Sequence, residues 1–171
     1  QTTCSSKTIS ETLDFASILK ATRALSSEIQ LEDLVSTLLK IVIENAGAEK
    51  AALIFLRENN FYLEAIATKD NSIKHLSMPY ESSSDIPHSI INYVKHSLKT
   101  VVLDNATVKN NFISDEYLIQ HQPKSLLCTP ILNKGELTGL IYLENKLTIG
   151  AFTKERLEVI KLLSIQATVS L

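Results

Sequence analysis

Apolar residues recur every three or four positions in two stretches near the start of the chain. The first stretch covers residues 12–25, and the second runs from Leu31 to Ile43, before a glycine at position 47. This spacing puts the apolar side chains on one side of a helix, so it predicts two amphipathic helices. Gly47 fits the end of the second helix, because glycine readily adopts the left-handed backbone found there.

Two pairs of shorter apolar runs predict β-hairpins. Residues 51–67 hold two such runs on either side of a polar turn at Asn59 and Asn60, whose short amides tolerate left-handed backbone. A second pair lies within residues 125–145, where Gly135 accepts the positive φ that a tight turn demands. We therefore expect consecutive strands to pair antiparallel at both places.

Further segments lie between and after the hairpins. Helical spacing predicts a helix over residues 87–98 and one or two turns over residues 115–121, with a short strand at residues 100–103. Residues 68–85 show no such pattern, and we expect a long loop there. A last helix runs to Leu171, and we expect it to continue into another domain.

This order of elements predicts an α+β domain. The strands number five to six and are joined mostly by hairpins, which favours a central antiparallel sheet with helices on its faces. Residues 1–11 are rich in serine and threonine and are predicted to be a linker or tag remnant. Residues 12–171 then form a single domain of ordinary size.

Composition and charge narrow the classes of partner. The 171 residues are 44% hydrophobic and 21% charged, with a net charge of −2 and no run of basic residues. We therefore expect no nucleic acid as a partner, because nucleic-acid binding needs clustered cations. No apolar run is long enough to span a membrane and there is no signal peptide, so we expect no membrane contact. The two cysteines, Cys4 and Cys128, form no disulfide framework, which favours the cytoplasm.

Residue types used in catalysis and metal binding are not grouped along the sequence. Of the four histidines, His88 and His96 share a predicted helix but stand eight residues apart, too far to bind one metal ion together. The sequence contains no Cys-x-x-Cys or His-Glu-x-x-His spacing and no glycine-rich phosphate loop. We therefore expect neither a metal site nor a catalytic site.

Two segments carry a resemblance to a known family. LEDLVSTLLKIVIENAGAEKAALIFL at residues 31–56 and LLCTPILNKGELTGLIYLENK at residues 126–146 are similar to GAF domain sequences. The final stretch from Gly150 resembles GAF domains of cyanobacterial multidomain kinases, in which a Ser/Thr-kinase-like region precedes the domain and a histidine-kinase region follows it. The resemblance implies a GAF-like sheet whose N- and C-terminal helices pack together, within a larger signalling protein.

The motif of cyclic-nucleotide-binding GAF domains is only half present. Asn145-Lys146 and Phe152 match it, but Arg156 and Leu157 occupy the positions of its final Asp-Glu pair. The family's lysine pairs with that aspartate, so Lys146 would face a like charge here. The sequence therefore disfavours cyclic-nucleotide binding.

The attachment site of bilin-binding GAF domains is also missing. The Cys-His pair that holds the chromophore in that family falls on Glu116 and Tyr117 here. Cys128 follows about twelve residues later, within an apolar strand, and is predicted to be a small buried side chain. The sequence therefore disfavours a covalent bilin.

The resemblance implies a small-molecule pocket on one face of the sheet, under the irregular segments 68–85 and 104–123. The candidate ligand-binding residues are Tyr80, Asn111, Phe112, Tyr117, His121 and Cys128. Aromatic rings with a few polar groups suit such a site. The alternative is that Phe112 and Tyr117 fill the space and leave no cavity.

The terminal helices are a second candidate site. In many GAF domains they pack with a partner's copies, so the resemblance implies a homodimer. The candidate interface residues are Ile18, Leu25, Ile160, Leu163 and Leu171. The alternative is that both helices pack only on their own sheet.

These features lead to one expected function and two alternatives. We expect a non-catalytic module that senses a small molecule or relays a signal within a larger cytoplasmic protein kinase, and that couples pocket occupancy to the terminal helices. The first alternative is a structural dimerisation module with no ligand. The second is an enzyme or redox sensor acting through Cys128.

Overall fold

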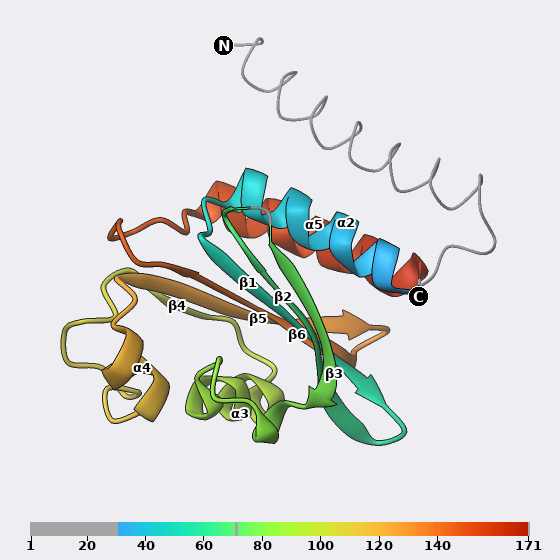
Figure 1. The fold of residues 1–171 in the computed structure, drawn as a ribbon, viewed down its shortest axis with the longest axis horizontal. Helices are drawn as coiled ribbons and strands as arrows, with labels where there is room; N and C mark the ends of the chain where they lie inside the picture. Colours follow the sequence, from blue (N-terminus) through green and yellow to red (C-terminus); the bar gives the residue numbers. More distant parts are fainter. Residues whose placement is uncertain (1–30, 71, 171) are drawn as a thin grey trace, which may run out of the picture.

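A computed structural model describes residues 31–70 and 72–170 of the chain. Six strands form one antiparallel sheet in the order β3-β2-β1-β6-β5-β4 (Figure 1). The strands are β1 (Lys50–Arg57), β2 (Asn60–Thr68), β3 (Ile73–Pro79), β4 (Val101–Leu103), β5 (Ser125–Asn133) and β6 (Glu136–Asn145). The helices of this part of the chain are α2 (Leu31–Ala46), α3 (His88–Ser97), α4 (Glu116–His121) and α5 (Lys154–Ser170), with a 3-10 turn, η1 (Tyr80–Ser82). The predicted α+β fold is confirmed.

Both predicted hairpins are present. β1 pairs with β2 and β5 pairs with β6, each in antiparallel register. In the first turn the left-handed residues are Glu58 and Asn59, with φ of 48° and 71°, whereas Asn60 already belongs to β2. This turn therefore lies one residue earlier than the sequence predicts. In the second turn Gly135 has a φ of 82°, as the sequence predicts.

An edge strand occupies part of residues 68–85, so the prediction of one long loop there was wrong. β3 pairs with β2 alone, and its side chains are half-buried or exposed. An edge strand needs no continuous apolar run, because much of it faces solvent. The left-handed Ser77, with a φ of 45°, also interrupts the extended backbone. For both reasons the spacing of apolar residues does not predict this strand.

Helices cover the two faces of the sheet in separate layers. α2 and α5 lie side by side on one face, and α3 and α4 lie on the other (Figure 1). Gly47 ends α2 with a φ of 73°, which confirms its predicted role. The predicted helix at residues 12–25 and the predicted linker at residues 1–11 lie outside the described residues.

Strand alternation divides the buried side chains into two clusters, because successive residues of a strand point to opposite faces. The first cluster joins the sheet to α2 and α5 and includes Leu39, Val42, Leu53, Ile141 and Ile160. The second cluster joins the sheet to α3 and α4 and includes Ile54, Ile90, Ile91, Leu118 and Tyr142. Neighbours such as Leu53 and Ile54 thus belong to different clusters.

The predicted dimer interface falls mostly outside the side chains that the structure describes. Ile18, Leu25, Leu163 and Leu171 belong to that undescribed group. The fifth residue, Ile160, has none of its surface exposed and packs within the first cluster of its own chain. A homodimer through the terminal helices stays a prediction.

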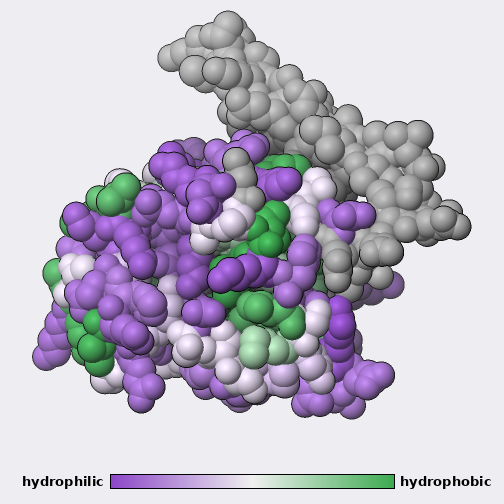
Figure 2. All heavy atoms as spheres, viewed as in Figure 1, coloured by the Kyte–Doolittle hydropathy of each residue, from purple (hydrophilic) through white to green (hydrophobic). Residues whose placement is uncertain are grey.

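In the view of Figure 2 the coloured surface is mainly hydrophilic or neutral, with a hydrophobic patch near the middle. Some large apolar side chains are nevertheless exposed, among them Ile119 of α4 and Leu147 in the loop before α5. Within the described residues no helix is both long and apolar enough to cross a membrane.

Gly139 provides a test of the central strand pair β1–β6. A Cβ atom at this position would lie 2.5 Å from the backbone oxygen of Ile54 and 2.7 Å from the Phe55 ring. Because backbone in the middle of a sheet cannot easily move, we expect Gly139→Ala to lower the free energy of unfolding by about 2–3 kcal/mol. Urea denaturation measures this change.

Gly135→Ala is the matched control for this prediction. Nothing lies within 4 Å of a Cβ atom at Gly135, so this variant carries only the strain of a left-handed φ, about 1 kcal/mol. A loss at Gly139 no larger than that at Gly135 would show that the β1–β6 contact tolerates a methyl group.

Candidate ligand pocket

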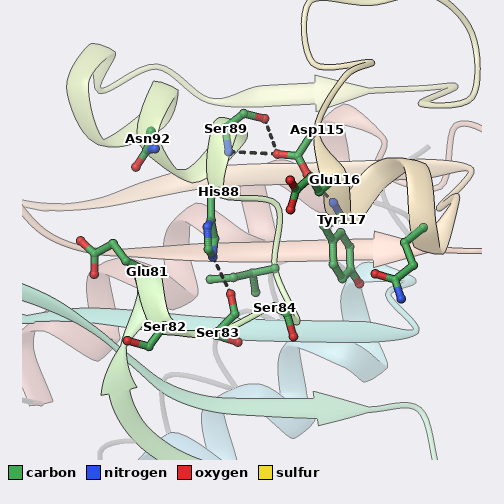
Figure 3. Close-up of a pocket in the computed structure, with 12 residues that line it drawn as sticks. Glu81, Ser82, Ser83, Ser84, His88, Ser89, Asn92, Asp115, Glu116 and Tyr117 are labelled. Atoms are coloured by element: carbon green, nitrogen blue, oxygen red, sulfur yellow. Dashed lines mark hydrogen bonds between the residues drawn. The ribbon is translucent and has the colours of Figure 1, made fainter.

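A cavity of about 570 Å³ opens between the N-terminal ends of α3 and α4 and the segment that follows β3. Its volume lies in the range of sites for small organic molecules. The residues that line it are Glu81, Ser82, Ser83, Ser84, Ile86, His88, Ser89, Asn92, Asp115, Glu116, Tyr117 and Gln120. Figure 3 shows how most of these side chains lie around the opening.

Asp115 joins the two helices that border the pocket. Its Oδ1 accepts hydrogen bonds from the amides of Tyr117 at 2.9 Å and Leu118 at 3.3 Å, so it caps α4. Its Oδ2 accepts from the Ser89 amide at 3.0 Å and from the Ser89 hydroxyl, at the start of α3 (Figure 3). Aspartate is a preferred residue at a helix N-terminus because its oxygens satisfy amides that have no partner inside the helix. One side chain thus positions both helix ends.

The segment between η1 and α3 forms the opposite wall. The His88 Nε2 atom lies 2.5 Å from the Ser83 carbonyl oxygen, toward which the ring points in Figure 3. The Ser83 hydroxyl accepts from the Asp85 amide at 3.1 Å. The Tyr80 hydroxyl donates to Asn92 Oδ1 at 2.6 Å, which attaches η1 to α3. These contacts hold irregular backbone in place beside the cavity.

A buried polar cluster lies behind Tyr117. The Tyr117 hydroxyl donates to Glu144 Oε1, and the Tyr142 hydroxyl lies 3.3 Å from the same oxygen. Lys50 Nζ donates to the Tyr117 hydroxyl at 2.8 Å and to the Asp85 carbonyl oxygen at 2.6 Å. Lys50 and Glu144 are themselves paired across β1 and β6. Tyr117 therefore links the pocket wall to the central strands.

Burial dominates the acid–base behaviour of this cluster. It raises the pKa of Tyr117 and of Tyr142, and the neighbouring Glu144 charge acts in the same direction. Burial lowers the pKa of Lys50, while Glu144 and Asp85 oppose that shift. Both phenols therefore stay protonated, and remain hydrogen-bond donors, at neutral pH.

Glu144 is not fully satisfied by these contacts. Its side chain has none of its surface exposed. Within residues 31–70 and 72–170, two buried side-chain oxygens have no hydrogen-bond partner, Glu64 Oε1 and Glu144 Oε2. A buried polar atom in this state is rare and calls for an explanation. Of the two carboxyl groups, only that of Glu144 contacts a residue that lines the pocket.

The lining is acidic. Glu81, Asp115 and Glu116 contribute carboxyl groups, and none of the described residues lining the cavity is a lysine or an arginine. Such a lining repels anionic ligands and attracts cations. No group of three or more histidine, cysteine or acidic side chains suited to a metal ion occurs in the part of the chain that the structure describes.

Asn145, the residue after Glu144, connects the central strand to the opposite helical layer. Its Nδ2 donates to the Gly47 carbonyl oxygen at 2.9 Å, at the end of α2. Its Oδ1 accepts from the amides of Leu147 and Thr148, both at 2.8 Å, in the loop that leads to α5. A single amide side chain therefore holds together β6, the end of α2 and the approach to α5.

Arg156 lies at the same junction. Its guanidinium group donates to the Ala151 carbonyl oxygen at 2.5 Å and covers Gly47, where a Cβ atom would lie 2.1 Å from Arg156 Nη1. Phe152, which matches the family motif, is buried in the first cluster. The positions of the half-matched motif thus shape the junction of α2, β6 and α5, on the face of the sheet away from the pocket.

Of the predicted ligand-binding residues, one lines the cavity and others lie near it or apart from it. Tyr117 lines it, and His121 stacks on the Tyr117 ring with a centroid separation of 4.3 Å. Tyr80 is buried beside the wall through its bond to Asn92. Phe112 packs edge-on against Tyr93 outside the lining. Both rings pack against the second cluster, and a cavity remains beside Tyr117, so the alternative that they fill the ligand site stays open.

The two remaining predicted residues lie apart from the cavity. Asn111 is exposed and is not among the lining residues. Cys128 is fully buried in the second cluster, which confirms its predicted burial, and this raises the pKa of its thiol. A thiol without access to water or to a base is a poor nucleophile.

Most of the wall was not found from the sequence. The lining serines at positions 82–84 lie within residues 68–85, whose sequence shows no helical or strand pattern. The bond between Ser89 and Asp115 joins residues 26 positions apart, and no local pattern marks such a contact. A usable signal was the Asp115 cap, because an aspartate just before a short apolar helix marks a helix start.

Comparisons with known proteins give the family and the fold. The family model described as GAF domain matches residues 30–171. The chain is 42% identical over 82 residues, 48% of its length, to hybrid signal transduction histidine kinase G of Dictyostelium discoideum, and covers 2% of that protein. It is 26% identical over 159 residues, 91% of its length, to peroxide stress-activated histidine kinase mak3 of Schizosaccharomyces pombe, and covers 7% of it.

The fold has a solved counterpart. The GAF domain of the Acinetobacter phosphoenolpyruvate-protein phosphotransferase superposes with a TM-score of 0.65 at 17% identity, covering 92% of this chain and 90% of that one. The two kinase relatives come from an amoeba and a yeast. The expected likeness to cyanobacterial kinases stays a prediction.

Asp115 is the first test of the pocket's construction. We expect Asp115→Ala to lower the free energy of unfolding by about 1–2 kcal/mol, because the α4 cap is lost. In a double-mutant cycle with Ser89→Ala we expect a coupling of about 1 kcal/mol. Asp104→Ala is the control, since Asp104 contacts Gly150 through its backbone oxygen. Additive losses from Asp115→Ala and Ser89→Ala would show that the hydrogen bond from the Ser89 hydroxyl to Asp115 does not stabilise the fold.

A second prediction concerns the burial of Cys128. In a Cys4→Ser variant we expect a disulfide reagent at pH 8 to label Cys128 about a thousandfold more slowly in the folded protein than in guanidinium chloride, because labelling requires unfolding. Absorbance of the released thiolate measures both rates. Rapid labelling of the folded protein would contradict the burial and restore the redox alternative.

Proposed function

The chain belongs to the GAF domain family, since the family model spans residues 30–171, and we propose that it is a non-catalytic sensor module that couples pocket occupancy to its terminal helices. Its kinase relatives support a place within a larger signalling protein kinase, of which this chain is a small part. We propose a histidine kinase acting in the cytoplasm as that larger protein.

One observation carries the coupling. Tyr117 lines the pocket and hydrogen-bonds to Glu144, and the next residue, Asn145, hydrogen-bonds to the end of α2 and to the loop before α5. Two consecutive residues of β6 therefore contact the pocket wall on one face and the helical junction on the other. A movement of Tyr117 reaches that junction through one strand.

This mechanism requires the ligand to bind two states with different affinity. A ligand shifts an equilibrium only by its differential affinity for the states involved. The α4 helix, with six residues, is short, and Asp115 is its link to α3. We propose that an occupied pocket displaces Tyr117 and α4, changes the Glu144 contacts, and so shifts the position of α2 relative to α5.

The residues present disfavour the ligands of the specialised family members. An acidic lining opposes the phosphate of a cyclic nucleotide, and Glu116 and Tyr117 offer no thiol to a bilin. The mak3 relative is named for activation by peroxide stress. Among the described residues the cysteine is Cys128, and its full burial disfavours a direct thiol sensor at that position. A small molecule bound without a covalent bond fits the site best.

Native mass spectrometry tests the sensor proposal. We expect freshly purified chain to carry an added small-molecule mass that disappears on denaturation. Ser84→Trp should remove this mass, because Ser84 is exposed and its replacement places an indole in the cavity. Lys99→Trp is the control, an exposed site that does not line the cavity. A chain that carries no ligand, and retains none from a metabolite extract, would contradict the proposal.

Hydrogen–deuterium exchange tests the coupling. We expect an occupied pocket to slow exchange at residues 81–92 and also to change exchange at residues 146–153. In Asn145→Ala the first effect should persist and the second should disappear, since that variant removes the bond to Gly47. A response at residues 146–153 that survives in Asn145→Ala would show that β6 does not carry the coupling.

A further inference from the structure

We propose that the ligand of this pocket is a small organic cation whose nitrogen donors bind Glu144 in place of the Tyr117 hydroxyl. This inference rests on the proposed function, because it names the ligand class of the same pocket.

Glu144 carries the first observation. The carboxyl group lies on a central strand with none of its surface exposed, and Oε2 has no hydrogen-bond partner among the described residues. Both of its phenol donors, Tyr117 and Tyr142, contact the same oxygen, Oε1. Each phenol has one proton to donate, so neither can serve the second oxygen as well. The site thus has an acceptor that the protein leaves unused.

Tyr117 separates this acceptor from the cavity. It lines the pocket with 5% of its surface exposed, and its hydroxyl lies against Glu144. An ammonium group has three N–H donors and a guanidinium group has five, so either can bind both carboxyl oxygens. A phenol replaced by such a group leaves Glu144 with more hydrogen bonds than before. The exchange also moves Tyr117, which is the step that the proposed coupling needs.

Charge favours the same class of ligand. Glu81 and Glu116 are exposed at the pocket, so they attract a cation toward it. The exposed hydroxyls of Ser82 and Ser84 add hydrogen-bond acceptors along the wall.

Lys50 opposes the binding of a cation, because its ammonium group contacts Tyr117. Its Nζ is held by the Asp85 carbonyl oxygen, and burial lowers the pKa of its ammonium group. It offsets at most one carboxyl group, while Glu81, Asp115 and Glu116 remain on the pocket lining. The balance at the pocket stays negative.

Three four-carbon probes of equal length test the ligand class. Butane-1,4-diamine, butane-1,4-diol and succinate differ in having cationic, neutral and anionic ends. We titrate each into the nitrogen-15-labelled 171-residue chain and follow the amide signals of Ser89 and Tyr117. We expect the diamine to bind about tenfold more tightly than the diol, because its donors meet a charged acceptor, and succinate to bind most weakly. A diamine that binds no more tightly than the diol overturns the proposal.

Two variants locate the effect at Glu144. Glu144→Gln keeps the shape of the side chain and should reduce diamine affinity to that of the diol. Glu64→Gln is the matched control, because Glu64 is the other buried carboxyl group with an unpartnered oxygen, and it contacts Arg57 and Ser77 instead of the pocket. Equal diamine affinity in Glu144→Gln and the parent chain overturns the proposal. Urea denaturation confirms that both variants are folded.

Tyr117→Phe gives an effect that loss of structure would not produce. The variant keeps the ring but removes the hydroxyl that the ligand must displace, so we expect diamine affinity to rise about threefold to tenfold. An affinity that falls to the diol level contradicts the displacement of Tyr117.

The outcomes separate this inference from the sensor proposal. If the native ligand is neutral or anionic and is lost in Ser84→Trp, the proposal of a cationic ligand is wrong, whereas the sensor proposal is supported. No added mass from purified chain or extract, together with no response to any of the three probes, overturns both.

Discussion

The structure depends on the pairing of β1 with β6 at the centre of the sheet. Both strands have buried residues on both faces, and their buried apolar side chains divide between the cluster under α2 and α5 and the one under α3 and α4. The two helical layers share few direct contacts across a sheet that is one backbone thick. The central strands therefore offer a direct route by which one layer can influence the other.

Short polar side chains make the connections that this arrangement requires. Asp115 joins α4 to α3 beside the pocket, and Asn145 joins β6 to α2 and to the approach to α5 on the other face. Each satisfies backbone groups that helix ends and loops leave without partners. Glu144, between them in the network, differs because one of its oxygens is unsatisfied. The polar groups of the fold are thus mostly structural, with one exception next to the cavity.

The sequence allowed much of the fold to be predicted, because α2, the two hairpins and α3 follow local rules of spacing, capping and turn chemistry. It did not reveal β3, since an edge strand with exposed side chains lacks the apolar run that identifies a buried one. Tyr117 was a candidate because it lies in an irregular segment. Glu144 was not, because a glutamate near the end of an apolar strand resembles any exposed strand end. Its burial follows from α4, whose packing over β6 no local pattern encodes.

The pocket wall separates recognition from stability. Ser82 and Ser84 are exposed, and neither belongs to a buried cluster, whereas Glu144 and Asn145 lie in the interior. Substitutions at the two serines alter the cavity without opening a void in the core or breaking the contacts at the helical junction. Descendants of this domain can therefore diverge in what they bind at little cost to folding. Substitutions at Glu144 and Asn145, the residues proposed to transmit the signal, would instead disturb interior contacts.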